Sequence, residues 1–550
     1  MKTHVTNAAP PRLAPCDPRA TRDSGEFPQH ATGRPTPYSR FSAILQCSAR
    51  WVPWFAALVG ALILLRLAHF GGHLDGPHYW RDCDTAHYAM DFYAHGIRLL
   101  HPRVCWLGGH GTHVLEFPLP EALMALAYHV LGPKIAVARG VTLLFFLGSA
   151  CCLHRIVLRL RGSRAARLTT LFYLAAPLSI GYSRAVHVDF SAVFFGHAML
   201  YCLLRGCEDG KAAWMLLGSS LGTLGFLVKA PYVFYLFLPL GFHAWRVGKV
   251  RALLKWSPLL ACPAVAFLWW RWHADSVNAA SPDWRVIPGY WPFVMNGWGY
   301  FGPLAMRLHP THWMAIARRA VLLVTGDLGL CFFLAGLLAR PAVATGVGFF
   351  RVWLAGSGAY VAIFFNLNWI HDYYQIPLLA PCAFFLAQGL EVLFLDRAPR
   401  CSERLRLAFA ATILLLLATS VRTAERVYFK VDWPTVRAGR AIGESTPENA
   451  LVIVAHARKS AWFGDPRVLY HARRNGWPVI LADLSAPLVE TLRDHGATHL
   501  AILTDAPLPP RAGELLERRP AQEFDLGQGW RLLLSRAHGE APGGPQLRSR

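Results

Sequence analysis

Acidic side chains gather in the segment that follows the first apolar run of the sequence. Within RDCDTAHYAMDFYAHG (residues 81–96), Asp82 and Asp84 stand two positions apart, and Glu116 follows in the same interval between apolar runs. Two carboxylates at this spacing can bind a divalent metal, and one carboxylate can take a proton from a hydroxyl as a general base. A solvated loop would account for the same acids. We take Asp84 and Glu116 as the candidate catalytic acids and Asp82 as a secondary candidate.

Basic and aromatic side chains recur at three later junctions between apolar runs. The candidates there are Arg184, His187, Asp189, Lys229, His371 and Tyr374. A lysine or arginine can stabilise the charge that grows on a phosphate leaving group. Structural alternatives stay open: an Arg184–Asp189 ion pair, a lysine that snorkels to the interface, and an interfacial belt of aromatic residues.

The composition predicts that a membrane-embedded scaffold positions these groups. The chain has 550 residues, of which 54% are hydrophobic and 16% are charged, whereas ordinary soluble proteins carry about 25% charged residues. Runs long enough to span a bilayer predict about eleven transmembrane helices within residues 51–421. These runs lie near 51–70, 137–158, 168–185, 189–205, 213–228, 231–246, 256–271, 319–339, 352–369, 375–395 and 405–421.

The basic residues between the runs predict the orientation of the chain. Arginine-rich segments occupy every second gap, which the positive-inside rule places in the cytoplasm together with a polar, disordered tail, residues 1–50. The first outer loop, 71–136, and residues 422–550 are then outside, provided that 117–132 is an interfacial helix and not a span. The net charge of +22 comes from basic residues in short clusters between the apolar runs, as in membrane topology. A nucleic-acid partner is therefore not expected.

The pattern of residues 422–550 predicts a small α/β domain outside the membrane. Segments 450–457, 498–504 and 530–535 have the character of strands, and 487–496 has helical spacing with a glycine stop. No P-loop and no GxGxxG motif occurs in the sequence. Of the cysteines, Cys83 and Cys105 fall in segments that we place outside; a disulfide between them is one expectation, and two free thiols are the other.

Several segments resemble, in order, the motifs of the GT-C integral-membrane glycosyltransferases, which include protein O-mannosyltransferases, the aminoarabinose transferase of lipid A and bacterial relatives of the RgtA/B/C/D type. RDCDTAHYA resembles their DE-x-x-Y motif, with Asp84 and Tyr88 in place of its aspartate and tyrosine and Thr85 in place of its glutamate. EFPLPEALMALAYHVLGP resembles the E-K-P-P-L segment, with Glu116 retained and Phe117 in place of the lysine. Later segments that resemble family motifs are SRAVHVDFSAVFF, HDYYQIPLLAPCAFFLAQGL and LYHARRNGW.

This resemblance implies an α-helical polytopic membrane enzyme of the GT-C fold that takes a sugar from a polyprenyl-phosphate donor. The sugar would pass, with inversion, to an acceptor hydroxyl on a lipid, glycan or protein at the outer face of a bacterial inner membrane. By the resemblance, Asp84 is the general base and Glu116 assists it. The donor and its phosphate would be bound by Lys229, Arg184, His371, Tyr374 and Tyr88.

The resemblance requires no cofactor, although a divalent metal at Asp82 and Asp84 stays an open alternative. Because Thr85 and Phe117 depart from the motifs, a catalytically degenerate family member is a second reading of the sequence. A multi-pass lipid or polysaccharide transporter is the third.

Overall fold

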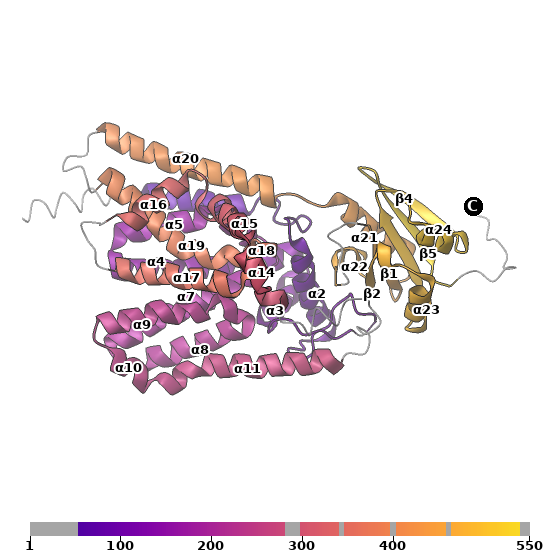
Figure 1. The fold of residues 1–550 in the computed structure, drawn as a ribbon, viewed down its shortest axis with the longest axis horizontal. Helices are drawn as coiled ribbons and strands as arrows, with labels where there is room; N and C mark the ends of the chain where they lie inside the picture. The colour runs from indigo at the N-terminus through magenta and orange to yellow at the C-terminus, as the bar shows by residue number, and fades with distance from the viewer. Residues whose placement is uncertain are drawn as a thin grey trace, which may run out of the picture. The chain divides into compact units, whose positions relative to one another are not determined.

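The computed structural model describes residues 53–109, 111–280, 298–339, 346–395, 403–457 and 464–538, all of which belong to one compact unit. Helices make up most of this part, and the C-terminal residues form a sheet (Figure 1). The expected cytosolic tail, residues 1–50, lies outside the described residues. The predicted division of the chain near residue 422 falls within α20 (Glu403–Tyr428) and stays a prediction.

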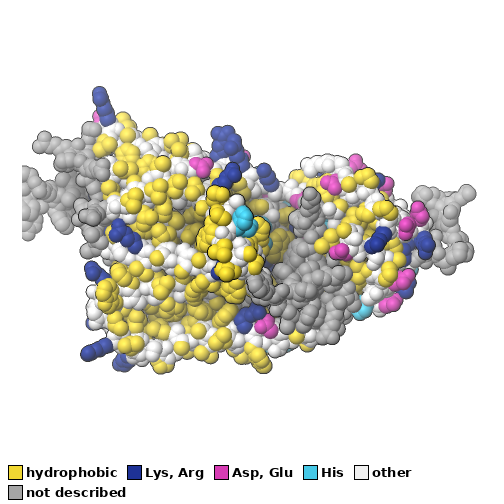
Figure 2. Space-filling model, in the orientation of Figure 1, with side chains coloured by type: hydrophobic (Ala, Val, Ile, Leu, Met, Phe, Trp, Pro, Cys, Tyr) yellow, Lys and Arg dark blue, Asp and Glu magenta, His cyan; other side chains and the backbone are white. Residues whose placement is uncertain are grey.

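Long helices form where the longest apolar runs were predicted. Five segments of the described residues are long and apolar enough to cross a membrane: Ile135–Arg161 (α4), Asp189–Asp209 (α7), Ala212–Tyr232, Tyr373–Leu395 and Glu403–Tyr428 (α20). The third segment consists of α8 (Ala212–Lys229) and η1 (Ala230–Tyr232). The fourth consists of η5 (Tyr373–Leu378), α19 (Leu379–Leu390) and η6 (Glu391–Leu395). Figure 2 shows hydrophobic side chains across the visible face of these helices, as expected for a surface in contact with lipid.

Other predicted runs are interrupted, so the described residues contain fewer long, unbroken helices than the sequence has apolar runs. The run 168–185 divides into α5 (Ser163–Ala175) and α6 (Pro177–Tyr182), because the residue before a proline is driven out of the helical region. Ala176 accordingly has an extended ψ of 134°. The run 319–339 contains a 96° bend between Pro310–Thr325 and Gly329–Leu338, and Gly326 in the break has a φ of 73°.

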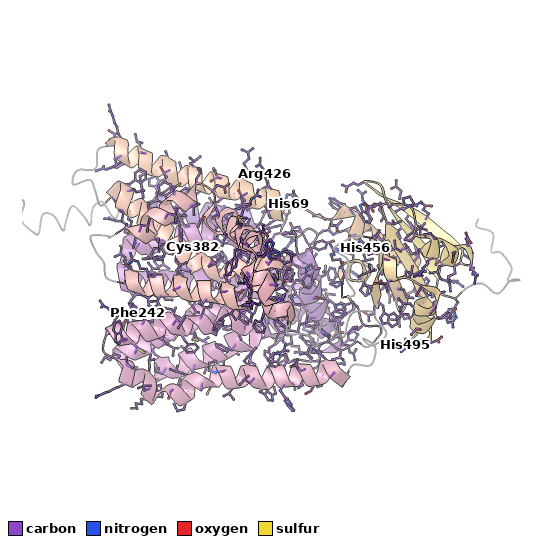
Figure 3. The ribbon with its side chains drawn as sticks, in the orientation of Figure 1. His69, Phe242, Cys382, Arg426, His456 and His495 are labelled. Atoms are coloured by element: carbon purple, nitrogen blue, oxygen red, sulfur yellow. The ribbon has the colours of Figure 1, made fainter. Side chains whose placement is uncertain are left out.

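The remaining helices are mostly short. They are Pro53–Arg66, α9 (Phe237–Arg246), η2 (Phe234–Leu236), α10 (Val250–Lys255), α11 (Ser257–Ala280), α13 (Trp298–Phe301), α14 (Leu304–Leu308), α15 (Pro310–Ala320), η4 (Val321–Thr325), α16 (Gly329–Leu338), α17 (Val347–Ile363) and α18 (Phe365–Ile370). Their apolar side chains fill the space between the longer helices, and Cys382 of α19 lies within this packed region (Figure 3).

The predicted first outer loop contains two helices, α2 (Tyr79–His95) and α3 (Leu119–Leu131). The 13 residues of α3 extend about 20 Å, which is too short to cross a hydrocarbon core of about 30 Å. This agrees with the prediction that 117–132 does not span. The two helices pack through a buried cluster that includes Ala86, Ala89 and Met124.

The C-terminal part is a five-stranded mixed sheet of strand order β2-β1-β3-β5-β4. Strand β1 (Leu451–His456) pairs in parallel with β2 (Asn475–Ile480) and β3 (His499–Thr504), and β5 (Trp530–Arg536) is antiparallel to β3 and β4 (Ala521–Gly527). The predicted strands correspond to β1, β3 and β5, and the predicted helix corresponds to α23 (Ala486–Asp494). The other helices here are α21 (Trp433–Ser445), α22 (Arg467–Ala472), η7 (Leu481–Asp483) and α24 (Pro510–Glu517).

Candidate functional site

The first turn of α2 places Arg81 beside two of the predicted acids. Arg81 Nη1 lies 3.7 Å from Asp84 Oδ2, one helical turn away, and Arg81 Nη2 forms an ion pair with Glu116. Asp84 Oδ1 accepts a hydrogen bond of 2.9 Å from the indole N–H of Trp106. Asp84 is only 2% exposed, whereas the Glu116 side chain is 25% exposed. Asp84 and Glu116 therefore share one guanidinium group.

Lys229, the last residue of α8, extends this arrangement to a third acid. Its Nζ lies 2.6 Å from Asp189 Oδ1, at the start of α7, and 4.0 Å from Glu116 Oε1. Three tyrosine rings surround the ammonium group with their centroids 4.4 to 5.0 Å away: Tyr232, Tyr373 and Tyr374. Such rings attract a cation through their negative faces, so they hold Lys229 in place without neutralising it.

These contacts form one continuous line of alternating charge, which we call the charge line: Asp84, Arg81, Glu116, Lys229 and Asp189. The line brings together Asp84, Glu116 and Lys229, which the sequence predicted as acids and phosphate ligand from three separate segments. An anionic ligand that binds Lys229 must compete there with Asp189 and Glu116. The binding of an anion at Lys229 is therefore coupled to the protonation of Asp189 and Glu116.

His371, Tyr374 and His187 lie beside the same tyrosine rings. The His371 ring stacks on Tyr373 with centroids 4.9 Å apart, and the His187 ring lies 4.9 Å from Tyr373. Among the described residues, the buried atoms His371 Nδ1 and His187 Nε2 have no hydrogen-bond partner, whereas His187 Nδ1 lies 3.4 Å from Asp189 Oδ2. Buried polar atoms of this kind ordinarily have a partner, so they are suited to bind an oxygen-rich ligand.

Tyr88 has a different place from the one that the sequence indicated. Its side chain is buried, and its hydroxyl donates a hydrogen bond of 2.5 Å to the main-chain oxygen of His113. This bond ties α2 to the loop that carries Glu116. The hydroxyl is thus engaged in positioning the loop.

Arg184 and Asp82 belong to a second buried cluster. Arg184 Nη1 lies 2.8 Å from Asp75 Oδ2, and Arg139 Nη2 lies 2.9 Å from Asp75 Oδ1. The Arg184–Asp189 pair that the sequence left open is therefore wrong, since each residue has another partner. Burial raises the pKa of Asp82 well above its usual range, with Arg139 opposing. Asp82 is thus under the electrostatic influence of Arg139 and Arg184, whereas Asp84 is beside Arg81 and Trp106.

The alternative of a Cys83–Cys105 disulfide is also wrong, because both residues are free thiols. Cys83 packs in the cluster between α2 and α3, whereas Cys105 packs in the cluster that contains the sheet. The two sulfur atoms are thus held in different hydrophobic clusters.

Comparison with known proteins places this geometry in a fold family. The family model described as dolichyl-phosphate-mannose-protein mannosyltransferase matches residues 115–272, which contain Glu116, Asp189 and Lys229. The crystal structure of ArnT from Cupriavidus metallidurans bound to undecaprenyl phosphate matches with a TM-score of 0.59 at 15% identity and covers 90% of this chain and 99% of that chain. The chain therefore shares the fold of this ArnT structure.

Two further proteins are similar to this chain. The Archaeoglobus fulgidus oligosaccharyltransferase in its apo form matches with a TM-score of 0.50 at 12% identity, over 82% of this chain and 69% of that chain. A Bacillus subtilis (strain 168) protein named "Putative mannosyltransferase YycA" is 33% identical over 141 residues. That alignment covers 24% of this chain and 20% of YycA, so the chain spans about a fifth of that relative.

The two acids that contact Arg81 differ in their electrostatics. Burial raises the pKa of Asp84 to about 7, with Arg81 and the Trp106 indole opposing it. Burial acts in the same direction on Glu116, but Arg81 and Lys229 outweigh it and hold the pKa of Glu116 below its ordinary value. Asp84 is therefore the acid that titrates near neutral pH, where a general base works best.

Some residues of the site were not predicted. Arg81 carried a usable signal, because positions i and i+3 share one face of a helix and the segment 81–84 opens α2. Tyr373 adjoins the predicted pair His371 and Tyr374. Trp106 carried no signal, because its contact with Asp84 depends on how the loop between α2 and α3 folds.

Glu121, in the first turn of α3, gives a prediction about stability. It is 2% exposed, and its Oε2 has no hydrogen-bond partner among the described residues. Burial raises its pKa from 4.5 to about 8, against the effect of Arg81. The folded chain thus binds this proton more tightly than the unfolded chain, so stability falls as pH rises from about 4.5 to about 8.

Glu121→Gln is expected to remove this pH dependence, because the amide is neutral at every pH. The free energy of unfolding of Glu121→Gln should exceed that of the native chain by at most about 5 kcal/mol above pH 8, and the difference should vanish near pH 4.5. Thermal unfolding in detergent at pH 6 and pH 9 measures it, with the exposed Glu490→Gln as control. Parallel pH dependence in the native and Glu121→Gln proteins would contradict the prediction.

Proposed function

We propose that this chain is a glycosyltransferase that moves a sugar from a polyprenyl-phosphate donor to an acceptor hydroxyl, with inversion and with Asp84 as the general base. The observation that carries the proposal is the charge line, which joins a buried acid of pKa about 7 to a lysine inside an aromatic cage. The GT-C fold and the mannosyltransferase family match over 115–272 support the same reaction.

The donor side of the site is the region around Lys229. The ammonium group binds a phosphate oxygen and stabilises the negative charge as the phosphate leaves. The rings of His187 and His371 lie against Tyr373, and His187 Nε2 and His371 Nδ1, which have no hydrogen-bond partner among the described residues, can donate further hydrogen bonds to the same group. The ring faces of Tyr373 and Tyr374 suit the sugar or the isoprenoid.

The acceptor side of the site is the region around Asp84. Because Trp106 binds Oδ1, the acceptor hydroxyl gives its proton to Oδ2. The acceptor oxygen then forms a bond to the anomeric carbon as the bond from that carbon to the phosphate oxygen breaks, and the phosphate leaves with the electron pair. A single displacement of this kind inverts the anomeric centre. Glu116 holds Arg81 next to the base.

We place the reaction at the outer face of a bacterial inner membrane, with the N-terminus in the cytoplasm and the C-terminal sheet in the periplasm. This orientation rests on the basic segments of the sequence. The loop between the first spans then presents Asp84 to an acceptor on that side, which can be a lipid, a glycan or a protein.

Mass spectrometry of a deletion strain tests the proposal. Loss of the enzyme should remove one sugar from an envelope glycolipid or glycan and lead to accumulation of a polyprenyl-phosphate sugar. Expression of the native chain should reverse both changes, whereas the Asp84→Asn chain at the same membrane level should reverse neither. An envelope and a lipid pool identical to those of the parent strain would overturn the proposal.

A further inference from the structure

The segment between α2 and α3 is joined to the C-terminal sheet by main-chain hydrogen bonds. Gly108 N donates to Gly476 O, and Gly476 N donates to Cys105 O, each at 2.9 Å. Gly108 and Gly476 form an antiparallel bridge, and Gly476 lies in β2, the edge strand of the sheet. The segment Cys105–Gly108 thus occupies the sheet edge, where unpaired main-chain groups would otherwise be exposed.

Gly476 is required for the close approach of β2 to β1, and so for the position of the edge that Cys105–Gly108 joins. A Cβ atom at position 476 would lie 1.9 Å from Val452 O of the neighbouring strand, a distance that no side chain tolerates. Beside the bridge, Val104, Trp106 and Leu107 pack in the same hydrophobic cluster as Val452 and other residues of the sheet. The junction therefore combines main-chain pairing with a shared core.

Trp106 connects this junction to the proposed base. It follows Cys105, whose carbonyl accepts the bond from β2, and its own indole N–H donates to Asp84 Oδ1 at 2.9 Å. The side chain is 2% exposed. Because the indole has one donor and no acceptor, it orients the carboxylate through Oδ1, while Oδ2 faces Arg81 Nη1 at 3.7 Å.

We propose that the C-terminal domain is part of the catalytic apparatus: its edge strand β2 holds Cys105–Gly108 so that Trp106 positions the Asp84 carboxylate. This inference rests on the proposed role of Asp84. Trp106 is then a positioning residue, and Gly476 acts through it. The sheet belongs to the active site although the contact with Asp84 comes from the outer loop.

The pH–rate profile of Trp106→Phe tests the role of the indole. Phenylalanine keeps an aromatic ring and removes the N–H, which stabilises the ionised carboxylate. The ascending limb of the plot of kcat/KM against pH should move up by about one pH unit. The fold-decrease in kcat should exceed the fold-change in the KM for the acceptor. Trp272→Phe, at an exposed tryptophan of α11, is the matched control. If kcat/KM falls at every pH and the ascending limb stays at the native pH, Trp106 has only a structural role.

The variant Gly476→Ala tests the role of the sheet. It should produce the same shift of the ascending limb in the native chain and no further shift in Trp106→Phe, because both changes act on one hydrogen bond. Additive shifts would overturn the connection through Trp106. If Gly476→Ala fails to reach the membrane, the Trp106→Phe profile still decides the positioning role.

Asp84→Asn separates failure of this inference from failure of the proposed function. An inactive Asp84→Asn chain with native profiles in Trp106→Phe and Gly476→Ala would refute the positioning role and leave the base in place. An Asp84→Asn chain with native transfer would refute the base itself.

Discussion

Asp84→Asn is expected to lower the rate of sugar transfer by about 10³-fold, within the range ascribed to a general base. Asparagine has the size of aspartate and an oxygen that can accept the Trp106 hydrogen bond, so the fold should be retained. It cannot take the acceptor proton. The loss should therefore fall on kcat, while the KM for the lipid donor changes little, because the donor phosphate binds at Lys229.

The native enzyme should also show the titration of this base. Since the pKa of Asp84 is raised to about 7 and the carboxylate is the active form, transfer should increase with pH up to about 7 and level off above it. Transfer by membrane vesicles, measured from pH 5 to pH 9 at equal protein level, provides both readouts.

Asp91→Asn provides the control on the same helix. Asp91 is also buried in α2, but it pairs with His95 at 2.9 Å and has no contact with Arg81 that the structure records. Its substitution should leave the rate within a few-fold of the native value. Equal losses of transfer rate in Asp84→Asn and Asp91→Asn would mean that α2 tolerates no neutral substitution at a buried aspartate. The rate loss in Asp84→Asn would then not support a general base at Asp84.

Much of the fold could be predicted because hydrophobic length is a strong signal in membrane helices. Runs such as 137–158 and 189–205 correspond to α4 and α7 within a few residues. The signal fails where an apolar run contains a local breaker. Pro177 and Gly326 interrupt runs that are mostly apolar, so hydropathy alone joins segments that the main chain divides.

The sheet shows the same dependence on local chemistry. Strand β2 contains Pro478, which argues against a strand in the centre of a sheet but is allowed at an edge, where β2 lies. Strand β4 is largely exposed, so it lacks the buried pattern that identified β1 and β3. Edge position is a tertiary property, which explains why both strands were missed.

The site could be predicted by residue type but not by pairing. Ionisable groups beside apolar runs are costly, which directed attention to Asp84, Asp189 and Lys229. Nearness in the sequence was misleading for Arg184, which is five positions from Asp189 but pairs with Asp75. The partners of a buried charge are chosen by helix packing, and no local pattern contains that information.

Lys229→Gln is expected to lower transfer by about 10²–10³-fold, as found when one donor to a developing negative charge is removed. Both catalysis and donor binding should suffer, because the ammonium group contacts the phosphate before and during bond cleavage. Lys211→Gln, at the exposed start of the same helix, is the matched control and should transfer at the native rate. Initial rates at several donor concentrations separate kcat from KM.

The pairing of Lys229 with Asp189 requires a second variant, because Lys229→Gln alone leaves a buried carboxylate without its cation. Such a loss is itself destabilising. The double variant Lys229→Gln/Asp189→Asn removes both charges and should recover the native amount of folded protein, measured by thermal unfolding in detergent. Transfer should stay low, since the ammonium group that meets the phosphate is absent.

The two readouts then separate structure from chemistry at Lys229. If the double variant recovers transfer together with stability, Lys229 serves only to neutralise Asp189, and the phosphate must be stabilised elsewhere. If stability recovers and transfer does not, the ammonium group acts on the donor. Lys229→Arg should fall between these limits, because it retains the charge but places a planar, larger group among the rings of Tyr232, Tyr373 and Tyr374.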